Sequence, residues 1–240
     1  MSEIKVLAFD TGGTVLDWHS GFRDAFKHIG KKNGFERNWG ELANNLRKKS
    51  MKAMLQLGQN KPPSYTFDDA HRFCLEEVLT EEGITQLSDE DKHYIAYVTP
   101  HNFSCWSDFP KAQKRLREKF LVCSFTILSY RLIIDTARSN GLNWDAIFSC
   151  EGIGKYKMLP EPYIKVLEYL QVQPNECLMV AAHPWDLNAA RDAGFKTAYV
   201  ARESEWGHTR PPWADSVAIE KESYDIVVDN FSGLTSKLGI

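Results

Sequence analysis

Strand-like and helical segments alternate along the chain after Pro100, and this alternation constrains the fold more than any other sequence feature. The strand-like runs are Phe120–Leu128, Ala146–Cys150, Cys177–Ala182, Lys196–Ala201 and Asp225–Val228. The helical segments with which they alternate are Pro110–Lys119, Arg131–Asn140, Pro160–Leu170 and Leu187–Ala193. Because right-handed crossovers join strands in such a pattern, it predicts an α/β fold: a doubly wound parallel sheet with helices on both faces.

One further strand and a long helix-rich segment come before this region. The run Ile4–Phe9 is short, apolar and β-prone, and it ends in Asp10 followed by Gly12 and Gly13, which is typical of a buried strand that leads into a tight loop. From Trp18 to Val98 the sequence is rich in helix formers. We therefore expect residues 1–16 and 99–240 to form a Rossmann-like core, with residues 17–98 inserted as a helical cap.

Composition excludes several classes of protein. The 240 residues carry a net charge of 29 − 32 = −3, so the chain lacks the basic surface expected of a nucleic-acid-binding protein. The apolar runs are too short to span a membrane or to form a secretory signal. The five cysteines are scattered without a CxxC spacing, which indicates core residues rather than a metal or disulfide framework. We expect a cytoplasmic protein with no nucleic-acid or membrane partner.

Polar residues at the ends of the predicted strands indicate where the functional site lies. Ligands of open parallel sheets bind beyond the carboxyl ends of the strands. Asp10, Ser129, Asp186 and the loop around Lys157 all lie at or after such ends, so we expect them to converge. A carboxylate held rigidly at a strand tip, among backbone N–H groups, is a good candidate for a nucleophile, and Asp10 fits that description.

The stretch from Phe9 to Asp17 resembles the first motif of the haloacid dehalogenase-like hydrolase superfamily. Its phosphatases usually have an acid two residues after the nucleophile, which protonates the leaving group. Its dehalogenases lack that acid, since a halide leaves without a proton. Gly12 occupies this position, so the resemblance favours the type II 2-haloacid dehalogenases. It implies that Asp10 is the nucleophile and that Thr14 supplies a hydroxyl donor.

The second and third motifs of this family are matched at Ser129 and Lys157. Ser129 follows a predicted strand, where its hydroxyl is expected either to bind a substrate carboxylate or to cap the following helix. Tyr130 replaces the Asn that the family has next to this Ser. Lys157 resembles the family's active-site lysine, with Met158 in place of the usual Pro, and Lys155 is the competing candidate. An ammonium near Asp10 would lower the pKa of that carboxylate.

The fourth motif is matched by the segment from His183 to Asp186. The resemblance implies that Asp186 positions or deprotonates water, whereas an ordinary helix N-cap is the structural alternative. His183 stands where similar enzymes have a neutral amide, and it is expected either to help activate water or to be structural. Trp185 is expected to line an apolar pocket around the halogenated carbon or to belong to the core.

Arg47 is the candidate substrate-binding residue of the predicted cap. In similar dehalogenases an Arg of a cap helix holds the halide or the carboxylate, and a guanidinium can bind a carboxylate through two hydrogen bonds. The alternative is that Arg47 belongs to a solvated basic face together with Lys48 and Lys49.

These features together predict hydrolysis of short 2-haloalkanoic acids to 2-hydroxy acids through an ester on Asp10. Lys157, Asp186 and His183 are the further catalytic candidates, and Thr14, Ser129, Arg47, Gly12, Tyr130 and Trp185 are the substrate-binding ones. The prediction includes no cofactor and no metal, and it allows a homodimer. Two rivals remain: a Mg²⁺-dependent phosphohydrolase of the same superfamily, and a non-catalytic relative that acts as a binding module.

Overall fold

A six-stranded parallel sheet organises the molecule, whose structure is a computed structural model describing residues 3–55, 63–208 and 224–240. The strands are β1 (Val6–Phe9), β2 (Leu121–Thr126), β3 (Ala146–Ser149), β4 (Cys177–Ala181), β5 (Lys196–Val200) and β6 (Ile226–Val228). Their order across the sheet is β3-β2-β1-β4-β5-β6, and each neighbouring pair is parallel. The predicted α/β class and the six predicted strands are confirmed.

The strand order places the end of β1 at the position where such sheets bind ligands. Val6 lies beside Leu121 of β2 on one side and Cys177 of β4 on the other, and all of β1 is buried. A continuous apolar run is expected of a parallel strand that is covered on both faces. From β1 the chain proceeds outward through β2 and β3, and later through β4, β5 and β6. The order reverses between β1 and β4, so the crevice lies beyond their carboxyl ends.

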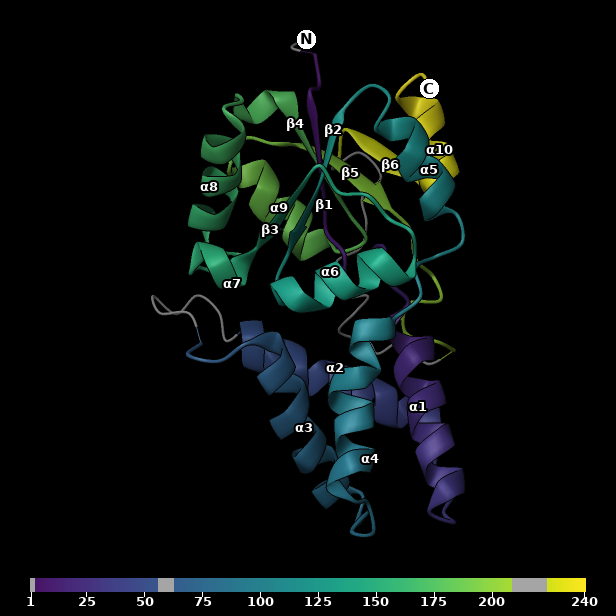
Figure 1. Cartoon of the computed structure of the whole chain (residues 1–240). Helices are drawn as coiled ribbons and strands as arrows, with labels where there is room; N and C mark the ends of the chain where they lie inside the picture. Colours follow the sequence, from purple (N-terminus) through teal and green to yellow (C-terminus); the bar gives the residue numbers. More distant parts are fainter. Residues whose placement is uncertain (1–2, 56–62, 209–223) are drawn as a thin grey trace.

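Helices cover both faces of this sheet. They are α5 (Phe109–Leu116), α6 (Tyr130–Ser139), α7 (Cys150–Ile153), α8 (Pro160–Leu170), α9 (Pro184–Asp192) and α10 (Phe231–Lys237), with short 3-10 turns η2 (Pro100–Asn102) and η3 (Pro174–Glu176). Figure 1 shows α8 and α9 on one side of the strands and α5 and α10 on the other. Rings of Phe9, Phe109 and Phe231 join β1 to α5 and α10, with centroids 4.8 to 5.8 Å apart.

Among the predicted helix boundaries that differ from the structure, one changes the role of a site residue. Helix α9 begins at Pro184, three residues before the predicted start, because Pro at the first helical position is already fixed in a helical φ. The N-cap residue is therefore His183, and Asp186 lies in the first turn. The alternative in which Asp186 is an N-cap is thereby excluded.

A second group of helices lies below the carboxyl ends of the strands in Figure 1. It contains α1 (Trp18–Lys32), α2 (Trp39–Leu55), α3 (Phe67–Glu81), α4 (Asp89–His93) and the π-helix η1 (Tyr94–Val98). The start of α4 is fixed by Ser88, whose hydroxyl accepts a hydrogen bond from the Asp91 N–H in a capping box. This arrangement agrees with an inserted cap, while the boundaries at residues 16/17 and 98/99 stay a prediction.

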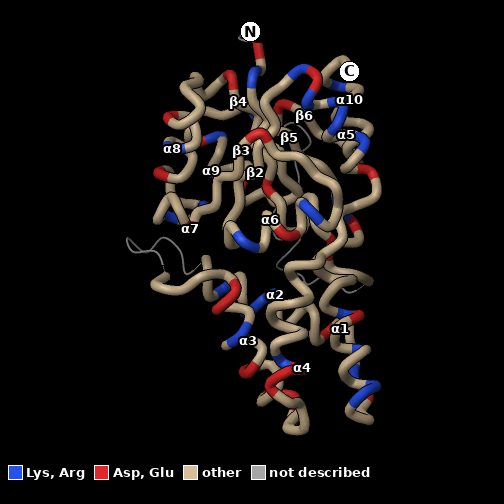
Figure 2. The backbone as a smooth tube through the Cα atoms, in the orientation of Figure 1, with Lys and Arg blue, Asp and Glu red and all other residues tan. Residues whose placement is uncertain are grey.

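Charged residues of both signs occur in both groups of helices. Figure 2 shows positions of Lys and Arg interspersed with positions of Asp and Glu along the backbone in both parts of the molecule. Cys123 and Cys177 are buried thiols of the sheet, as predicted, and each of the five cysteines is free. None of the described helices is both long enough and apolar enough to cross a membrane.

Candidate active site

Asp10 lies directly after β1 and is 4% exposed, with both carboxylate oxygens hydrogen-bonded. Oδ1 accepts from Lys157 Nζ at 2.9 Å, and Oδ2 accepts from Thr14 Oγ1 at 2.7 Å. His183 Nδ1 lies 2.9 Å from the same Oδ2. Burial favours the uncharged acid, but the charge of Lys157 and the hydrogen bond from His183 outweigh it, so the pKa of Asp10 lies well below its usual range.

A tight loop after β1 directs these contacts. The N–H groups of Val15 and Leu16 both donate to the carbonyl oxygen of Thr11, which folds the chain back beside Asp10. The Ala182 N–H at the end of β4 donates to Thr14 Oγ1 at 2.9 Å. Because that hydroxyl oxygen already accepts from Ala182, its own proton is directed to Asp10.

Lys157 is fully buried and bridges two carboxylates. Its ammonium donates to Asp10 Oδ1 and, at 2.5 Å, to Asp186 Oδ2. Burial would lower the pKa of Lys157, but the charges of Asp10 and Asp186 raise it above its ordinary value. Of the two candidate lysines, it is Lys157 that contacts Asp10. Met158 has a φ of 75°, which a proline ring cannot adopt, so the departure from the family's Lys-Pro pair accompanies a different local backbone.

Asp186 stands on the other side of this ammonium, in the first turn of α9. It has no exposed surface, and Tyr163 OH of α8 donates to its Oδ1 at 2.6 Å. Burial raises the pKa of Asp186, although Lys157 pulls it down. A carboxylate with a raised pKa accepts a proton more readily than Asp10 does. Asp186 is thus the better placed of the two to act as a base.

His183 joins Asp10 to a residue that the sequence analysis did not identify. Its Nε2 lies 2.9 Å from Oε1 of Glu205, in the turn after β5, and Trp18 Nε1 donates to the same oxygen at 3.0 Å. Burial disfavours the imidazolium, but the carboxylates of Glu205 and Asp10 outweigh it and raise the pKa of His183 to about 10. His183 therefore carries a positive charge at neutral pH, which conflicts with a role as the base that activates water.

Arg47 reaches the site from α2 and is 3% exposed. Its Nη2 donates to the carbonyl oxygen of Gly12 at 3.2 Å, and its guanidinium lies over the rings of Trp18 and Phe67 at 5.3 and 5.7 Å. Within the described part of the chain, its Nε has no hydrogen-bond partner and the guanidinium forms no ion pair. The alternative in which Arg47 belongs to a solvated face is wrong.

Gly12 makes room for this guanidinium. A Cβ at position 12 would lie 3.1 Å from Arg47 Nη2 and 3.5 Å from Leu128 Cδ1. The absence of a side chain therefore removes a possible acid and also admits a cation beside Asp10.

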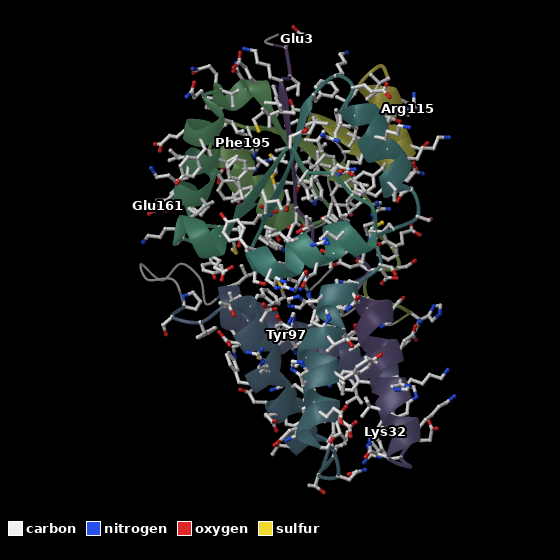
Figure 3. All side chains as sticks on the ribbon, viewed as in Figure 1. Glu3, Lys32, Tyr97, Arg115, Glu161 and Phe195 are labelled. Atoms are coloured by element: carbon white, nitrogen blue, oxygen red, sulfur yellow. The ribbon has the colours of Figure 1, made fainter. Side chains whose placement is uncertain are left out.

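Ser129 takes a position different from the one expected of a substrate ligand. Its hydroxyl oxygen accepts from the Leu132 N–H, so it caps α6, and its proton is donated to Asp68 Oδ2 of α3 at 2.7 Å. His101 contacts the other oxygen of Asp68 at 3.3 Å. The His101 ring lies 4.1 Å from the ring of Tyr97, which Figure 3 labels at the end of the helical group that faces the core. The capping role is confirmed, and a substrate contact requires Asp68 to give up this hydrogen bond.

The last two candidates are Tyr130 and Trp185. Tyr130 is 37% exposed and its ring lies against Gly152, where a Cβ would stand 2.6 Å from the ring. This arrangement therefore gives no support to the expected contact between Tyr130 and the substrate. Trp185 stacks on His183 with ring centroids 5.5 Å apart and planes at 20°. Trp185 therefore holds the imidazole ring from one face.

Sequence reasoning missed Glu205 and Tyr163. Glu205 follows the carboxyl end of the predicted strand Lys196–Ala201, so the rule that selected Asp10 and Asp186 also points to it. Tyr163 is one of several aromatic residues on its helix, and nothing in the sequence distinguishes it from a core residue.

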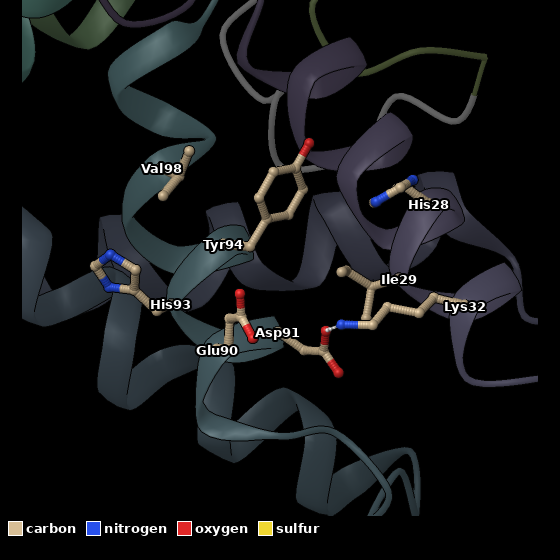
Figure 4. Close-up of a pocket in the computed structure, with 8 residues that line it drawn as sticks. All are labelled: His28, Ile29, Lys32, Glu90, Asp91, His93, Tyr94 and Val98. Atoms are coloured by element: carbon tan, nitrogen blue, oxygen red, sulfur yellow. Dashed lines mark hydrogen bonds and ion pairs between the residues drawn. The ribbon is translucent and has the colours of Figure 1, made fainter.

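A separate pocket of about 260 Å³ lies between α1 and the α4–η1 segment, away from the strand ends. Figure 4 shows Lys32 paired with Asp91 there, at 2.7 Å, beside His28, His93 and Tyr94. Among the residues that the structure describes, no three His, Cys, Asp or Glu side chains are grouped so as to hold a metal ion.

A doubly wound sheet with a buried Asp–Lys–Asp cluster at its switch point defines a class of hydrolases. The chain belongs to the haloacid dehalogenase-like hydrolase family, whose model matches residues 4–194. The crystal structure of an L-2-haloacid dehalogenase is similar over 98% of both chains, with a TM-score of 0.87 and 28% identity.

Curated relatives include more than one activity. An (S)-2-haloacid dehalogenase of Burkholderia cepacia is 22% identical over 218 residues, 85% of each chain. A phosphoglycolate phosphatase of Aquifex aeolicus is 23% identical over 217 residues, 86% of this chain and 87% of its own. The family model shows the family, whereas these relatives differ in substrate, so the substrate has to be argued from the site.

Proposed function

We propose that this hydrolase cleaves the carbon–halogen bond of short 2-haloalkanoic acids and releases 2-hydroxy acids. The observation that carries the proposal is the guanidinium of Arg47 on the carbonyl of Gly12, in the space where a side chain at position 12 would stand. A cation beside the nucleophile suits a leaving group that departs as an anion. The alkoxide of a phosphate ester instead needs a proton.

Arg47 also supports an anionic substrate. A buried cation without a carboxylate partner is unfavourable, and an incoming anion removes that cost. In the described residues the site has three cations: Lys157 and His183 contact the carboxylates of Asp10, Asp186 and Glu205, whereas the charges of Glu205 and Asp10 act on Arg47 without a direct contact. Arg47 is the member of this set without an ion pair, so it is the site for a substrate carboxylate or a departing halide.

In the first proposed step, an oxygen of Asp10 attacks C2 of the haloacid from the side opposite to the halogen. The carbon–halogen bond breaks, the halide leaves with the bonding electrons, and Asp10 becomes an ester. Burial and a low pKa keep Asp10 ionised and ready for this attack.

In the second proposed step, water attacks the carbonyl carbon of the Asp10 ester. Asp186 takes a proton from the water, because its raised pKa makes it the stronger base of the two buried aspartates. Breaking the bond between the carbonyl carbon and the ester oxygen regenerates Asp10 and releases the 2-hydroxy acid with inverted configuration at C2.

The second candidate function is phosphate-ester hydrolysis, and one contact favours it. A charged His183 beside Asp10 Oδ2 is able to donate a proton, which would replace the missing acid at position 12. The phosphatase relative belongs to this alternative.

Halide release separates the two candidates. Purified protein is incubated with chloro-, bromo- and fluoroacetate, with each 2-chloropropionate enantiomer, and with a generic phosphate ester, with and without EDTA. We expect halide release from one or more haloacids, unchanged by EDTA, and no phosphate release. Phosphate release that depends on added Mg²⁺, without halide release, would assign the chain to the phosphatases instead. Asp10→Asn removes the nucleophile and should release no halide. Asp24→Asn, which changes an exposed carboxylate of α1, is its matched control and should leave halide release unchanged.

A further inference from the structure

His183 lies between two buried carboxylates, and this geometry decides its charge. Nδ1 is 2.9 Å from Asp10 Oδ2, and Nε2 is 2.9 Å from Glu205 Oε1. An ionised carboxylate only accepts hydrogen bonds, whereas a neutral imidazole has a single N–H. Both contacts are satisfied together only by the imidazolium. In this geometry neither nitrogen of His183 has a free lone pair with which to accept a proton from water.

The rest of the site is built to hold Glu205 in place. Glu205 is 3% exposed, and the same oxygen that faces His183 accepts a hydrogen bond from Trp18 Nε1 at 3.0 Å. Gly13 has a φ of 97°, and a Cβ there would lie 2.1 Å from this oxygen. The second glycine of the loop is therefore required both by its backbone and by the approach of Glu205.

The two oxygens of Asp10 are consequently not equivalent. Oδ2 faces two donors, Thr14 at 2.7 Å and His183 at 2.9 Å, whereas Lys157 is the one donor to Oδ1 among the residues that the structure describes. The Thr14 hydroxyl is itself fixed by the Ala182 N–H. An oxygen held by two preorganised donors is where negative charge is stabilised best, which is the requirement for the oxyanion of ester hydrolysis.

We propose that Glu205 is a positioning residue that keeps His183 charged and directed at Asp10 Oδ2, so that His183 and Thr14 form the oxyanion-stabilising pair for hydrolysis of the Asp10 ester. Oδ1 is then the oxygen that attacks C2, and His183 is an electrostatic catalyst rather than a base. This inference rests on the proposed function, since it concerns the second step of that reaction.

The step balances without a further reactant. The oxygen of water forms a bond to Cγ of Asp10, and the π electrons of the carbonyl move to Oδ2, which becomes the oxyanion. The proton lost by water goes to Asp186. As the oxyanion reforms the carbonyl, the bond from Cγ to the ester oxygen breaks, and the departing alkoxide takes the proton from Asp186. The acid left on Asp10 ionises and releases one proton to solvent.

The charged groups around His183 agree with this role. Asp10 faces it from the end of β1 and Glu205 from the turn after β5, while the Trp185 ring on α9 is uncharged. The other cations of the site bind elsewhere, Lys157 on Oδ1 and Arg47 on the Gly12 carbonyl. The charge of Glu205 is the largest cause that raises the pKa of His183, so Glu205 still favours the imidazolium after Asp10 has become an uncharged ester.

A titration without substrate tests the positioning role independently of any activity. The imidazole nitrogens of His183 are followed by ¹⁵N NMR, with assignment by the His183→Asn variant. In the unaltered protein we expect no titration of His183 between pH 5 and 9. Glu205→Gln keeps an oxygen for Trp18 but removes the charge, and should lower the pKa of His183 by about 1–3 units. Glu203→Gln removes an exposed charge from the same turn and should change nothing. An unshifted His183 in Glu205→Gln would overturn the positioning role.

Single-turnover kinetics test the chemical role. The halide burst reports formation of the ester, and mass spectrometry of the intact protein reports its decay. In Glu205→Gln the decay of the ester should become slower as pH rises through the lowered pKa of His183, because the imidazolium is lost. If His183 were the general base, the decay would become faster over the same pH range. His183→Ala, which removes the donor, should slow decay by about 10²–10³-fold while changing the burst far less. Equal slowing of both steps would refute the inference. Absence of a halide burst from the unaltered protein would instead refute the proposed function and leave the NMR result standing.

Discussion

Replacement of Lys157 by methionine tests the electrostatic centre of the site. Methionine has a similar length and fills similar volume, so packing is largely kept while the charge is lost. In Lys157→Met the carboxylates of Asp10 and Asp186, both buried, lose the cation between them. Removing one partner of a buried ion pair costs about 3–5 kcal/mol, because it leaves an uncompensated charge. For a chain of this size that corresponds to a fall in Tm of roughly 6–20 °C.

The assay is thermal unfolding followed by circular dichroism at several pH values. The destabilisation should be smaller at pH 5 than at pH 8. Without the ammonium, one of the two carboxyls takes up a proton as the pH falls, and this removes the repulsion. Lys165→Met is the control, since Lys165 is exposed and its ion pair with Glu168 lies on the surface of α8. Such surface pairs contribute little.

A second substitution tests whether repulsion between the two carboxylates causes the destabilisation of Lys157→Met. Asp186→Asn in the Lys157→Met background removes one of the two like charges, so it should recover part of the lost stability, although Asp186→Asn alone destabilises. Residues in one hydrogen-bonded network are expected to be non-additive in this way. A Tm of Lys157→Met equal to that of Lys165→Met, or no recovery in the double variant, would refute the reasoning. Activity should be lost in Lys157→Met in either case, since the ammonium that holds both Asp10 and Asp186 in place is absent.

Three further outcomes are expected. Single turnover in H₂¹⁸O should place the ¹⁸O label on Asp10 before it appears in the product, and Asp10→Ala should abolish activity. A labelled first-turnover product together with an unlabelled Asp10 would contradict an ester intermediate on Asp10. Arg47→Lys should raise the KM for haloacids by about tenfold or more with little loss of stability, because an ammonium cannot form the two parallel hydrogen bonds that a guanidinium forms with a carboxylate. An unchanged KM would show that Arg47 does not bind the substrate. The free energy of unfolding should fall as pH rises from about 6.5 towards 10. Because folding raises the pKa of His183, the stability that His183 contributes is complete below its unfolded-state pKa and is lost above its folded-state pKa. If His183→Asn shows the same fall, the pH dependence belongs to another group.

Much of the core fold follows from local pattern. The six strands were predictable because each is a short apolar run, and parallel strands covered on both faces need that composition. The bounds were less accurate. Helix α9 begins at Pro184, before the apolar residues that marked it in the sequence, and the structure ends β2 at Thr126, two residues before the predicted end.

Spatial convergence of Asp10, Lys157 and Asp186 was also predictable, because strand ends of a parallel sheet meet at one edge. The choice of Lys157 over Lys155 rested on family register, and the 2.9 Å contact with Asp10 agrees with it. The burial of Arg47 was not predictable, since three consecutive basic residues are typical of a solvated face. It becomes buried only because α2 packs so that Trp18 and Phe67 enclose it.

The sequence by itself determined the sheet, the position of the nucleophile candidate at its edge and the absence of an acid at position 12. The charge state of His183 was decided by tertiary structure alone. A histidine has an ordinary pKa near neutrality, so its charge depends on which groups fold against it. Here Asp10 and Glu205, 195 positions apart in the chain numbering, close on its two nitrogens. No local sequence pattern predicts these two contacts, because they depend on how strands β1 and β5, and the turn after each of them, are placed in the folded chain.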